Sequence, residues 1–389
     1  ETAGFDSGRL EHAVDIVRQG CARGTYPGAV LLIERGGVEI VHEAFGFRSY
    51  APGAEVATVD TVYDVASMTK PMATASTVLR LVELGEVNLD DPLARYLPGV
   101  GGGAGETITV RHLLTHTSGL VADAPLWAAG EGGRPDCARA AVALTEAGAL
   151  ESAPGSVVRY SCIGYILLGL MVEAVVGEGL DAFVAREVFE PLGMGDTGFY
   201  TVDHFAARAR VAPTERRIGF EQGREFWQRL VGSGRFLDLH TADSVAHGAV
   251  HDENALAMGG VSGNAGLFST VGDVAKLARM YISGGMGAGG VQVLSPATVR
   301  LATCNHTSGL SENRGLGWFM NTPGNFFGNL LSPGAFGHTG YTGTAVWVDP
   351  LLELVVVLLT NRVHETRDNL ALISLRPRFI NAVVAAVTR

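Results

Sequence analysis

Two residues with the chemistry of a nucleophile and its base, Ser67 and Lys70, lie three positions apart in the chain. The apolar residues that follow, between Met72 and Leu84, have helical spacing, so both side chains are expected on one helix face. A serine hydroxyl becomes a usable nucleophile when a neighbouring base takes its proton, and a desolvated amine can be that base. Lysine occurs at only one other position, Lys276. The spacing predicts a serine nucleophile with a lysine base, and the alternative is an exposed lysine beside a helix-capping serine.

A tyrosine and a cysteine, Tyr160 and Cys162, stand where a loop leads into the helical stretch 163–176. A phenol at such a junction can point into a cleft, where a neighbouring cation lowers its pKa. An ordinary half-buried tyrosine fits the same pattern. Taken alone, the segment leaves both interpretations open.

The segment from Gly337 to Thr344 is rich in glycine and contains His338, Thr339, Gly340 and Tyr341. Glycine lets a substrate approach the backbone closely, and a free backbone N–H on such a strand can bind an oxyanion. The alternative is a glycine-rich strand with a solvated histidine. Taken alone, this segment does not decide between the two either.

The composition is that of a globular protein without the charge of a nucleic-acid or lipid binder. Of 389 residues, 47% are hydrophobic and 18% charged, and the formal net charge is −11 without a basic run. Four cysteines lie far apart with no metal or redox spacing, namely Cys21, Cys137, Cys162 and Cys304. The histidines show no His-Glu-x-x-His pattern or paired metal spacing, so no metal site is expected. No cofactor is expected either.

Two further expectations concern the membrane and the compartment. A membrane helix needs about 18 or more apolar residues, and the apolar stretch 351–360 is short and interrupted by Glu353. The first residues have neither the basic nor the apolar region of a signal peptide, which favours a cytoplasmic location. The chain as given also lacks an initiator methionine, so earlier removal of a leader stays open.

Strand patterns lie at both ends of the chain and helical patterns in the middle. Helices are expected over 6–23, 109–116, 135–148, 163–176, 180–189, 271–281 and, with an interruption at Pro377, 369–387. Strands are expected as a hairpin over 29–34 and 38–47, and over 315–320, 345–348 and 354–359. Without regular alternation, the pattern predicts an α/β (α+β) fold with an antiparallel sheet flanked by helices. Residues 1–85 and 240–389 are expected to form this discontinuous sheet domain, and 86–239 a mostly helical domain.

Taken in order, Ser67-x-x-Lys70, Tyr160-x-Cys162 and His338-Thr339-Gly340 resemble the three signatures of the serine β-lactamase and penicillin-binding protein superfamily. Four connecting stretches also resemble class C β-lactamases, DD-carboxypeptidases, D-amino-acid amidases and family VIII carboxylesterases, namely 112–120, 191–194, 251–255 and 266–270. The resemblance spans nearly the whole chain. It implies a sheet lobe made from both chain ends, a helical lobe, and an active site in the cleft between them.

The resemblance also implies roles for individual residues. Ser67 would be the nucleophile, and Lys70 and Tyr160 would share the base and acid duties. The backbone N–H groups of Ser67 and Tyr341 would form the oxyanion hole. The substrate would lie along Cys162 and the strand His338-Thr339-Gly340.

Two positions depart from these signatures. Cys162 stands where the second signature usually has asparagine, and a thiol is a poor hydrogen-bond partner for a substrate amide. His338 stands where Lys-Thr-Gly has lysine, so a fixed positive charge is replaced by a side chain that is mostly neutral at pH 7. Both changes weaken the expectation of β-lactam or D-Ala-D-Ala carboxylate recognition. The acylation chemistry is unaffected.

The sequence therefore predicts a serine hydrolase or acyltransferase that forms an acyl-enzyme on a small-molecule ester or amide, without a cofactor. The alternatives are a DD-carboxypeptidase or class C-like β-lactamase, a biosynthetic transacylase that passes the acyl group to an amine, and a non-catalytic ligand-binding protein of the same fold. The presence of both Ser67 and Lys70 argues against the last of these. No nucleic-acid partner and no membrane span are expected.

Overall fold

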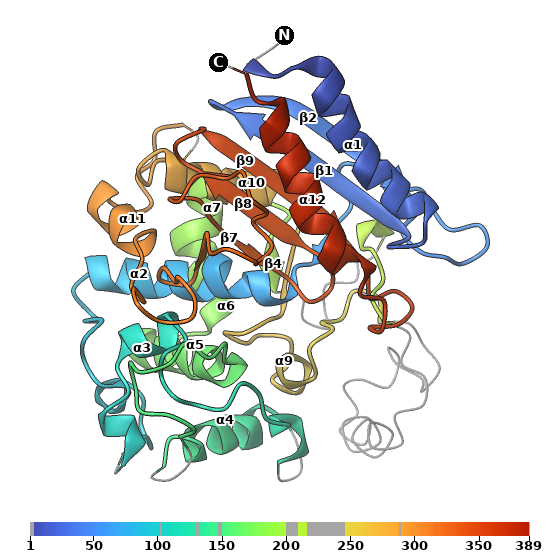
Figure 1. Cartoon of the computed structure of the whole chain (residues 1–389). Coiled ribbons are helices and arrows are strands. Elements are labelled where there is room, and N and C mark those ends of the chain that lie inside the picture. Colours follow the sequence, from blue (N-terminus) through green and yellow to red (C-terminus); the bar gives the residue numbers. More distant parts are fainter. Residues whose placement is uncertain are drawn as a thin grey trace.

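Six antiparallel strands form the central sheet, in the order β2-β1-β9-β8-β7-β6 (Figure 1). The computed structural model describes residues 4–101, 103–129, 133–146, 150–199, 209–215, 246–287 and 289–388. The strands of this sheet are β1 (Gly28–Arg35), β2 (Val38–Gly46), β6 (Phe319–Met320), β7 (Phe336–Thr339), β8 (Ala345–Asp349) and β9 (Leu354–Thr360). Ala29 of β1 lies opposite Thr360 of β9, so segments from both ends of the chain are neighbours. The predicted mixed fold with an antiparallel sheet is confirmed.

A second, smaller sheet has the order β3-β5-β4, and its strand β3 lies directly before the Ser67 segment in the chain. Its strands are β3 (Tyr63–Asp64), β4 (Gly198–Phe199) and β5 (Leu267–Ser269). The helices and the 3-10 and π turns (η) used below are α1 (Ser7–Ala22), η2 (Ala66–Met68), η3 (Lys70–Ala75), α2 (Ser76–Glu83), α3 (Val110–Leu114), α4 (Arg134–Ala143), α5 (Cys162–Val176), α6 (Leu180–Val184), η7 (Ala185–Phe189), α7 (Glu190–Leu192), α9 (Glu253–Ala257), α10 (Val271–Ile282), α11 (Pro296–Ala302) and α12 (Ala371–Ala386).

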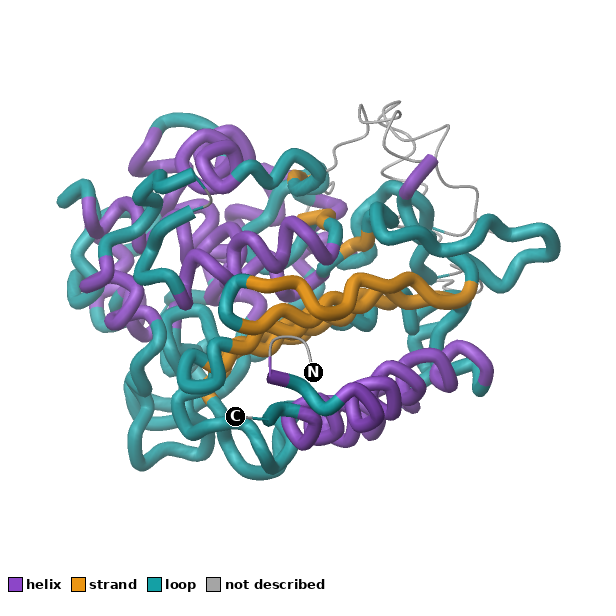
Figure 2. The backbone as a smooth tube through the Cα atoms, turned by 90° about the horizontal axis from the view of Figure 1, so that it is seen from above, coloured by secondary structure: helices purple, strands orange, loops and turns teal. Residues whose placement is uncertain are grey.

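The side chains of β1 divide between two cores, because successive residues of a strand point to opposite faces. Leu31 and Ile33 pack in a cluster with residues of α1 and α12. Val30 and Leu32 belong to a second cluster that includes residues of α2, α5 and α10. Figure 2 shows the terminal helices on one side of the strands and most other helices on the opposite side. Burial on both faces explains why β1 and β9 are almost continuously apolar.

The predicted division into a sheet domain and an inserted helical domain stays a prediction. Its boundary at 239/240 lies outside the described residues. In Figure 1, α3, α4 and α5 gather on one side of the molecule and the six-stranded sheet on the other. One apolar cluster contains Val30 of the sheet as well as Leu113 and Leu168 of those helices, so the two parts share a core.

The predicted interruption of the last helix at Pro377 is wrong. Helix α12 continues through the proline. Pro377 has no N–H to donate to the carbonyl of Ile373. Because Ile373 is exposed, water can donate a hydrogen bond to that carbonyl instead, and the helix continues.

The strand predicted over 315–320 forms only at its end, as β6. Gly317 has a φ of 86°, a left-handed value that an extended strand does not contain. The glycines of this segment therefore make a turn before the strand, and they do not extend it.

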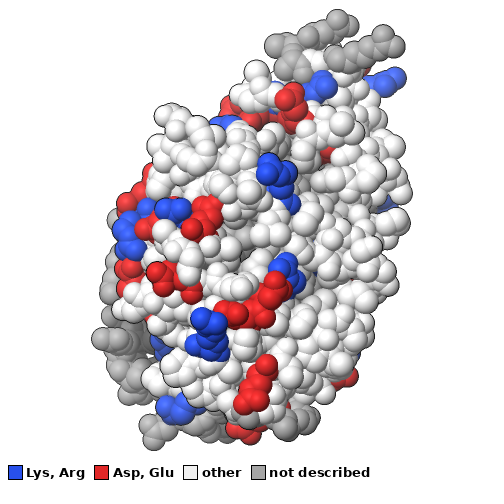
Figure 3. Space-filling view, turned by 90° about the vertical axis from the view of Figure 1, so that its left-hand side faces the viewer, with Lys and Arg blue, Asp and Glu red and all other residues white. Residues whose placement is uncertain are grey.

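No single helix in the described ranges is long and apolar enough to cross a membrane, and only α5 with the segment 180–192, bent by 79° relative to it, reaches the length and composition. The face drawn in Figure 3 carries Lys and Arg side chains next to Asp and Glu side chains. Such mixing gives that face no extended field of one sign.

Candidate active site

Ser67 and Lys70 lie on two successive short turns that lead into α2. Ser67 belongs to the 3-10 turn η2, and Lys70 begins the π-helical turn η3. The spacing of three residues brings the side chains together, with Lys70 Nζ 3.1 Å from Ser67 Oγ. Lys70 is fully buried and Ser67 is partly exposed. An exposed lysine beside a capping serine is therefore excluded.

The backbone directly before Ser67 is strained. Ala66 has a φ of 47°, a left-handed value that costs energy for residues other than glycine. Asp64 Oδ1 accepts a hydrogen bond from Ala66 N–H at 2.8 Å, and Asp64 Oδ2 accepts one from His251 N–H at 2.7 Å. Burial raises the pKa of Asp64 despite these donors and the nearby His251 side chain. Asp64 thus fixes the conformation from which Ser67 projects.

The amine of Lys70 is held by contacts from three residues on two further segments. Its Nζ donates to Asn264 O at 2.9 Å and lies 3.5 Å from Cys162 Sγ. The ring of Tyr160 is 4.9 Å away, centroid to Nζ. A buried amine with so many fixed neighbours has little freedom, which keeps it beside Ser67.

Lys70 and Tyr160 each shift the pKa of the other, and their predicted sharing of base and acid duties stays a prediction. Burial lowers the pKa of Lys70, but Cys162, Tyr160 and Asp252 together outweigh it, and the pKa lies above its ordinary value. Burial also raises the pKa of Tyr160, while Lys70 and the hydrogen bonds to Lys70 and Ser67 act in the opposite direction. The pair therefore keeps its protons at neutral pH and loses one on the alkaline side.

Tyr160 lies at the start of α5, as the sequence predicts. Ser161 caps this helix, because its Oγ accepts from Gly164 N–H at 3.1 Å. The backbone N–H of Ser161 donates to Nδ1 of the buried His116 at 3.0 Å, and the His116 ring lies 4.4 Å from the Tyr160 ring. The helix cap and this histidine together fix the position of the phenol.

Cys162 is the first residue of α5 and is partly exposed. Its backbone N–H donates to Ala122 O at 2.7 Å. Burial raises the pKa of the thiol although Lys70 lowers it, so the neutral thiol is favoured over a nucleophilic thiolate. The predicted place of Cys162 along the substrate stays a prediction.

His338 lies on β7 with its side chain fully buried. Its Nδ1 is 2.9 Å from Thr339 O, and within the described part of the chain its Nε2 has no hydrogen-bond partner. The ring lies 4.9 Å from Phe319 and 6.2 Å from Tyr160, between centroids. Burial, and then the charge of Lys70, hold the pKa of His338 well below its usual value. The side chain thus faces Tyr160 as a neutral imidazole, and its contact with substrate stays a prediction.

The turn between β7 and β8, which carries Gly340 and Tyr341, is hydrogen-bonded to the segment that leads into Ser67. Two threonine hydroxyls donate to carbonyls just before Ser67, namely Thr342 Oγ1 to Asp64 O at 2.6 Å and Thr344 Oγ1 to Val65 O at 3.1 Å. The two N–H groups predicted for the oxyanion hole, those of Ser67 and Tyr341, therefore belong to directly connected segments.

Gly340 leaves no room for a side chain, since a Cβ would lie 2.1 Å from Thr344 Oγ1 and 2.3 Å from Val65 O. Gly340→Ala is expected to displace the turn and lower kcat by about tenfold with a smaller change in KM, because misplaced oxyanion donors affect the transition state most. Steady-state kinetics check this. The control is Gly334→Ala, where the nearest atom to a Cβ is 4.0 Å away. An equal loss in both variants would contradict the expectation.

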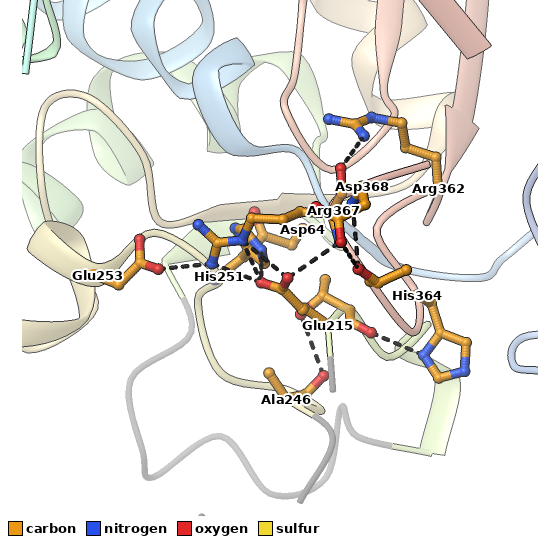
Figure 4. Close-up of polar contacts among 11 residues, drawn as sticks. Asp64, Glu215, Ala246, His251, Glu253, Arg362, His364, Arg367 and Asp368 are labelled. Atoms are coloured by element: carbon orange, nitrogen blue, oxygen red, sulfur yellow. Dashed lines mark hydrogen bonds and ion pairs between the residues drawn. The ribbon is translucent and has the colours of Figure 1, made fainter. Parts of the chain in front are cut away.

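A buried polar network adjoins the same turn (Figure 4). His251 Nε2 is 3.0 Å from Glu215 Oε2, and Arg367 Nε donates to both oxygens of Glu215. Although burial acts in the opposite direction, His251 and Arg367 lower the pKa of Glu215 to about 2. The His251 ring lies 5.7 Å from the Tyr341 ring, and its backbone N–H is bound to Asp64. The network therefore braces both segments of the predicted oxyanion hole.

Sequence reasoning missed Asp64, the carbonyl of Asn264 and the buried Arg314. The position of Asp64, three residues before Ser67, could have indicated that its carboxylate binds the backbone next to Ser67. No pattern in the sequence connects Arg314 with Tyr160, although its guanidinium carbon lies 5.6 Å from the phenol ring centroid. Across the described ranges, no group of three or more His, Cys, Asp or Glu side chains is placed to hold a metal ion.

Comparisons with known proteins identify the family of this chain. The profile of the Beta-lactamase family matches residues 13–376. An Escherichia coli (strain K12) protein called "Putative D-alanyl-D-alanine carboxypeptidase" is 34% identical over 395 residues, which cover 94% of this chain and 85% of that protein.

Two solved structures are similar in fold at low identity. A penicillin-binding protein homologue from Caulobacter crescentus has a TM-score of 0.72 at 21% identity, covering 98% of this chain and 99% of that one. "EstCE1, a hydrolase with promiscuous acyltransferase activity" has a TM-score of 0.68 at 24% identity, covering 98% of both chains. The matched range 13–376 includes Ser67, Lys70, Tyr160 and His338, in the order of the three signatures. By its sequence and its fold, this chain belongs to the Beta-lactamase family, within the serine β-lactamase and penicillin-binding protein superfamily.

Proposed function

We propose that this chain is a serine hydrolase or acyltransferase that forms a covalent acyl-enzyme on Ser67 from an ester or amide. The observation that carries the proposal is the 3.1 Å contact between Ser67 Oγ and Nζ of the buried Lys70. A partly exposed hydroxyl next to a buried ionisable pair, Lys70 and Tyr160, that can take its proton is the arrangement that nucleophilic catalysis requires. A non-catalytic binding protein would have no need of this pair.

The proposed reaction begins when the substrate carbonyl oxygen binds the N–H groups of Ser67 and Tyr341. Ser67 Oγ bonds to the carbonyl carbon while its proton passes to the Lys70–Tyr160 pair. The bond to the leaving group then breaks, and the pair returns the proton to it. Water or an amine attacks the acyl-enzyme in the same way, giving up a proton to the pair and restoring Ser67 Oγ–H.

A D-alanyl-D-alanine carboxypeptidase activity is the second candidate, because relatives 34% identical to this chain carry that name. Such a substrate ends in a carboxylate next to the scissile bond. The strand position that carries lysine in Lys-Thr-Gly here carries the buried, neutral His338. Neutral esters and amides therefore remain our first proposal, with an amine as a possible acceptor in place of water.

A substrate panel tests these alternatives. It contains p-nitrophenyl esters, D-amino-acid amides, a peptide ending in D-Ala-D-Ala and a chromogenic cephalosporin, each assayed with wild type and with Ser67→Ala as the matched control. We expect the highest Ser67-dependent kcat/KM on esters. The highest value on the peptide would establish the carboxypeptidase instead, and added amine that diverts product from acid to amide would identify a transacylase. Absence of Ser67-dependent turnover on every substrate would contradict the proposal.

A further inference from the structure

Arg314 is a buried cation that the proposed reaction does not use. Only 2% of its surface is exposed, although its ion-pair partner, Glu312, is half exposed. Within the described ranges, Arg314 Nε has no hydrogen-bond partner. Burial lowers the pKa of Arg314, while Glu312 and Tyr160 raise it. Removing a guanidinium from water costs free energy unless interactions with neighbouring groups compensate for the lost hydration. A buried arginine with an unsatisfied Nε therefore calls for a neighbour whose charged form it stabilises.

The guanidinium of Arg314 is directed toward aromatic rings. Its carbon lies 3.6 Å from the ring centroid of Phe319 and 5.6 Å from that of Tyr160. The rings of Phe319 and Tyr160 are stacked, with centroids 6.0 Å apart. An apolar ring beside both groups keeps the local dielectric constant low, so the charge of Arg314 is less screened from the phenol than it would be in water.

The other titratable groups around Tyr160 leave few positive charges to act on it. The nearby side chains are Lys70, His116, Cys162, Tyr165, Arg314 and His338. Burial holds the pKa of both histidines well below the usual value and raises the pKa of Cys162 and Tyr165, so these four are neutral near pH 7. Among the described residues that face the phenol, Lys70 and Arg314 are therefore the cations.

We propose that Arg314 is a positioning residue that stabilises the phenolate form of Tyr160. The inference rests on the proposed function. In the step, Ser67 Oγ–H breaks as Ser67 Oγ bonds to the carbonyl carbon, and the proton passes to the Lys70–Tyr160 pair. Arg314 transfers no proton, and it lowers the free energy of the charged phenolate.

The test is the pH dependence of kcat/KM in Arg314→Gln, with Arg314→Lys as the charge-preserving control. Loss of a cation near a phenolate moves a pKa by about one unit or more, so the rising limb of the profile should shift to higher pH by about one pH unit in Arg314→Gln. The value of kcat/KM at the alkaline plateau should change little. In Arg314→Lys, kcat/KM should rise at nearly the same pH as in the wild type. The same fold-loss at every pH, with an unshifted limb, would overturn the proposal and leave a structural role.

Glu312→Gln gives a second test that survives if Arg314→Gln fails to fold. Without the carboxylate, the charge of Arg314 acts on Tyr160 unopposed. The rising limb of the pH profile should therefore move to lower pH, and a shift to higher pH would overturn the proposal.

The ultraviolet absorbance of tyrosinate reports the ionisation of the phenol without any turnover. It is taken as the difference between each variant and the same variant with Tyr160→Phe. If the pH at which the tyrosinate absorbance appears shifts but Ser67 is not acylated, the proposed function is refuted and the role of Arg314 stands. Unshifted absorbance in both variants would refute the role of Arg314.

Discussion

Ser67→Ala is expected to abolish turnover of every substrate while the protein stays folded. The change removes only one hydroxyl from a partly exposed side chain, so its cost in stability is small. Without the nucleophile no acyl-enzyme forms, and we expect kcat/KM to fall by about 10⁴-fold or more. Activity on the best ester and the thermal unfolding midpoint measure the two parts of this expectation.

Mass spectrometry after treatment with a fluorophosphonate probe identifies the nucleophile directly. Wild type should gain one adduct, on the peptide that contains Ser67, and Ser67→Ala should gain none. Ser156→Ala is the control, since Ser156 is exposed and its hydroxyl donates to Ala153 O, three residues earlier in the chain. An adduct on Cys162 or any other residue in place of Ser67 would refute the assignment.

Removal of either member of the proton-accepting pair is the second large effect. We expect Lys70→Ala to lower kcat/KM by about 10³-fold and Tyr160→Phe by about 10² to 10⁴-fold, the range for a positioned proton-transfer group. The reason is that Lys70 Nζ lies 3.1 Å from Ser67 Oγ and 4.9 Å from the ring centroid of Tyr160, so both side chains are close to the proton that Ser67 must lose. Single-turnover acylation kinetics measure this step separately from binding and product release.

The raised pKa values of Lys70 and Tyr160 also predict the direction in which kcat/KM changes with pH. The pKa of Lys70 and the pKa of Tyr160 both lie above their ordinary values, so the pair must lose a proton on the alkaline side before it can accept one from Ser67. The wild-type kcat/KM should therefore rise as the pH increases above neutrality, and Tyr160→Phe should remove or displace this limb. A near-normal rate in Tyr160→Phe would show that Lys70 acts alone.

The parts of the site that follow from local spacing were predictable from the sequence. Ser67 and Lys70 meet because three residues make about one turn of a 3-10 or α-helix, and Ser67 lies in a 3-10 turn that ends two residues before Lys70. Tyr160 lies where a capping serine begins a long apolar helix, which is also a local signal. The strands β1 and β9 were predictable because burial on both faces makes them continuously apolar.

The parts that depend on long-range packing were not predictable. The complete burial of His338 results from Phe319 and neighbours on other segments, so the sequence alone could not decide between a histidine on the substrate strand and a solvated one. The strands of the small sheet have two or three residues each, too few for any periodicity. Arg314 sits next to a glycine-rich turn, and only the tertiary structure brings its charge to Tyr160.

The pairing of β1 with β9 determines when this protein can fold during its synthesis. Because Ala29 lies opposite Thr360, the central sheet cannot close until β9 has left the ribosome. Until then β1, buried along almost its whole length in the finished sheet, exposes apolar surface and an unpaired edge. Contacts so distant in sequence form slowly, since the loop-closure entropy is lost before the contacts are gained. The nascent chain is therefore expected to depend on chaperones or to aggregate, and ribosome-stalled chains that end before β9 should be protease-sensitive throughout their sheet-forming segments.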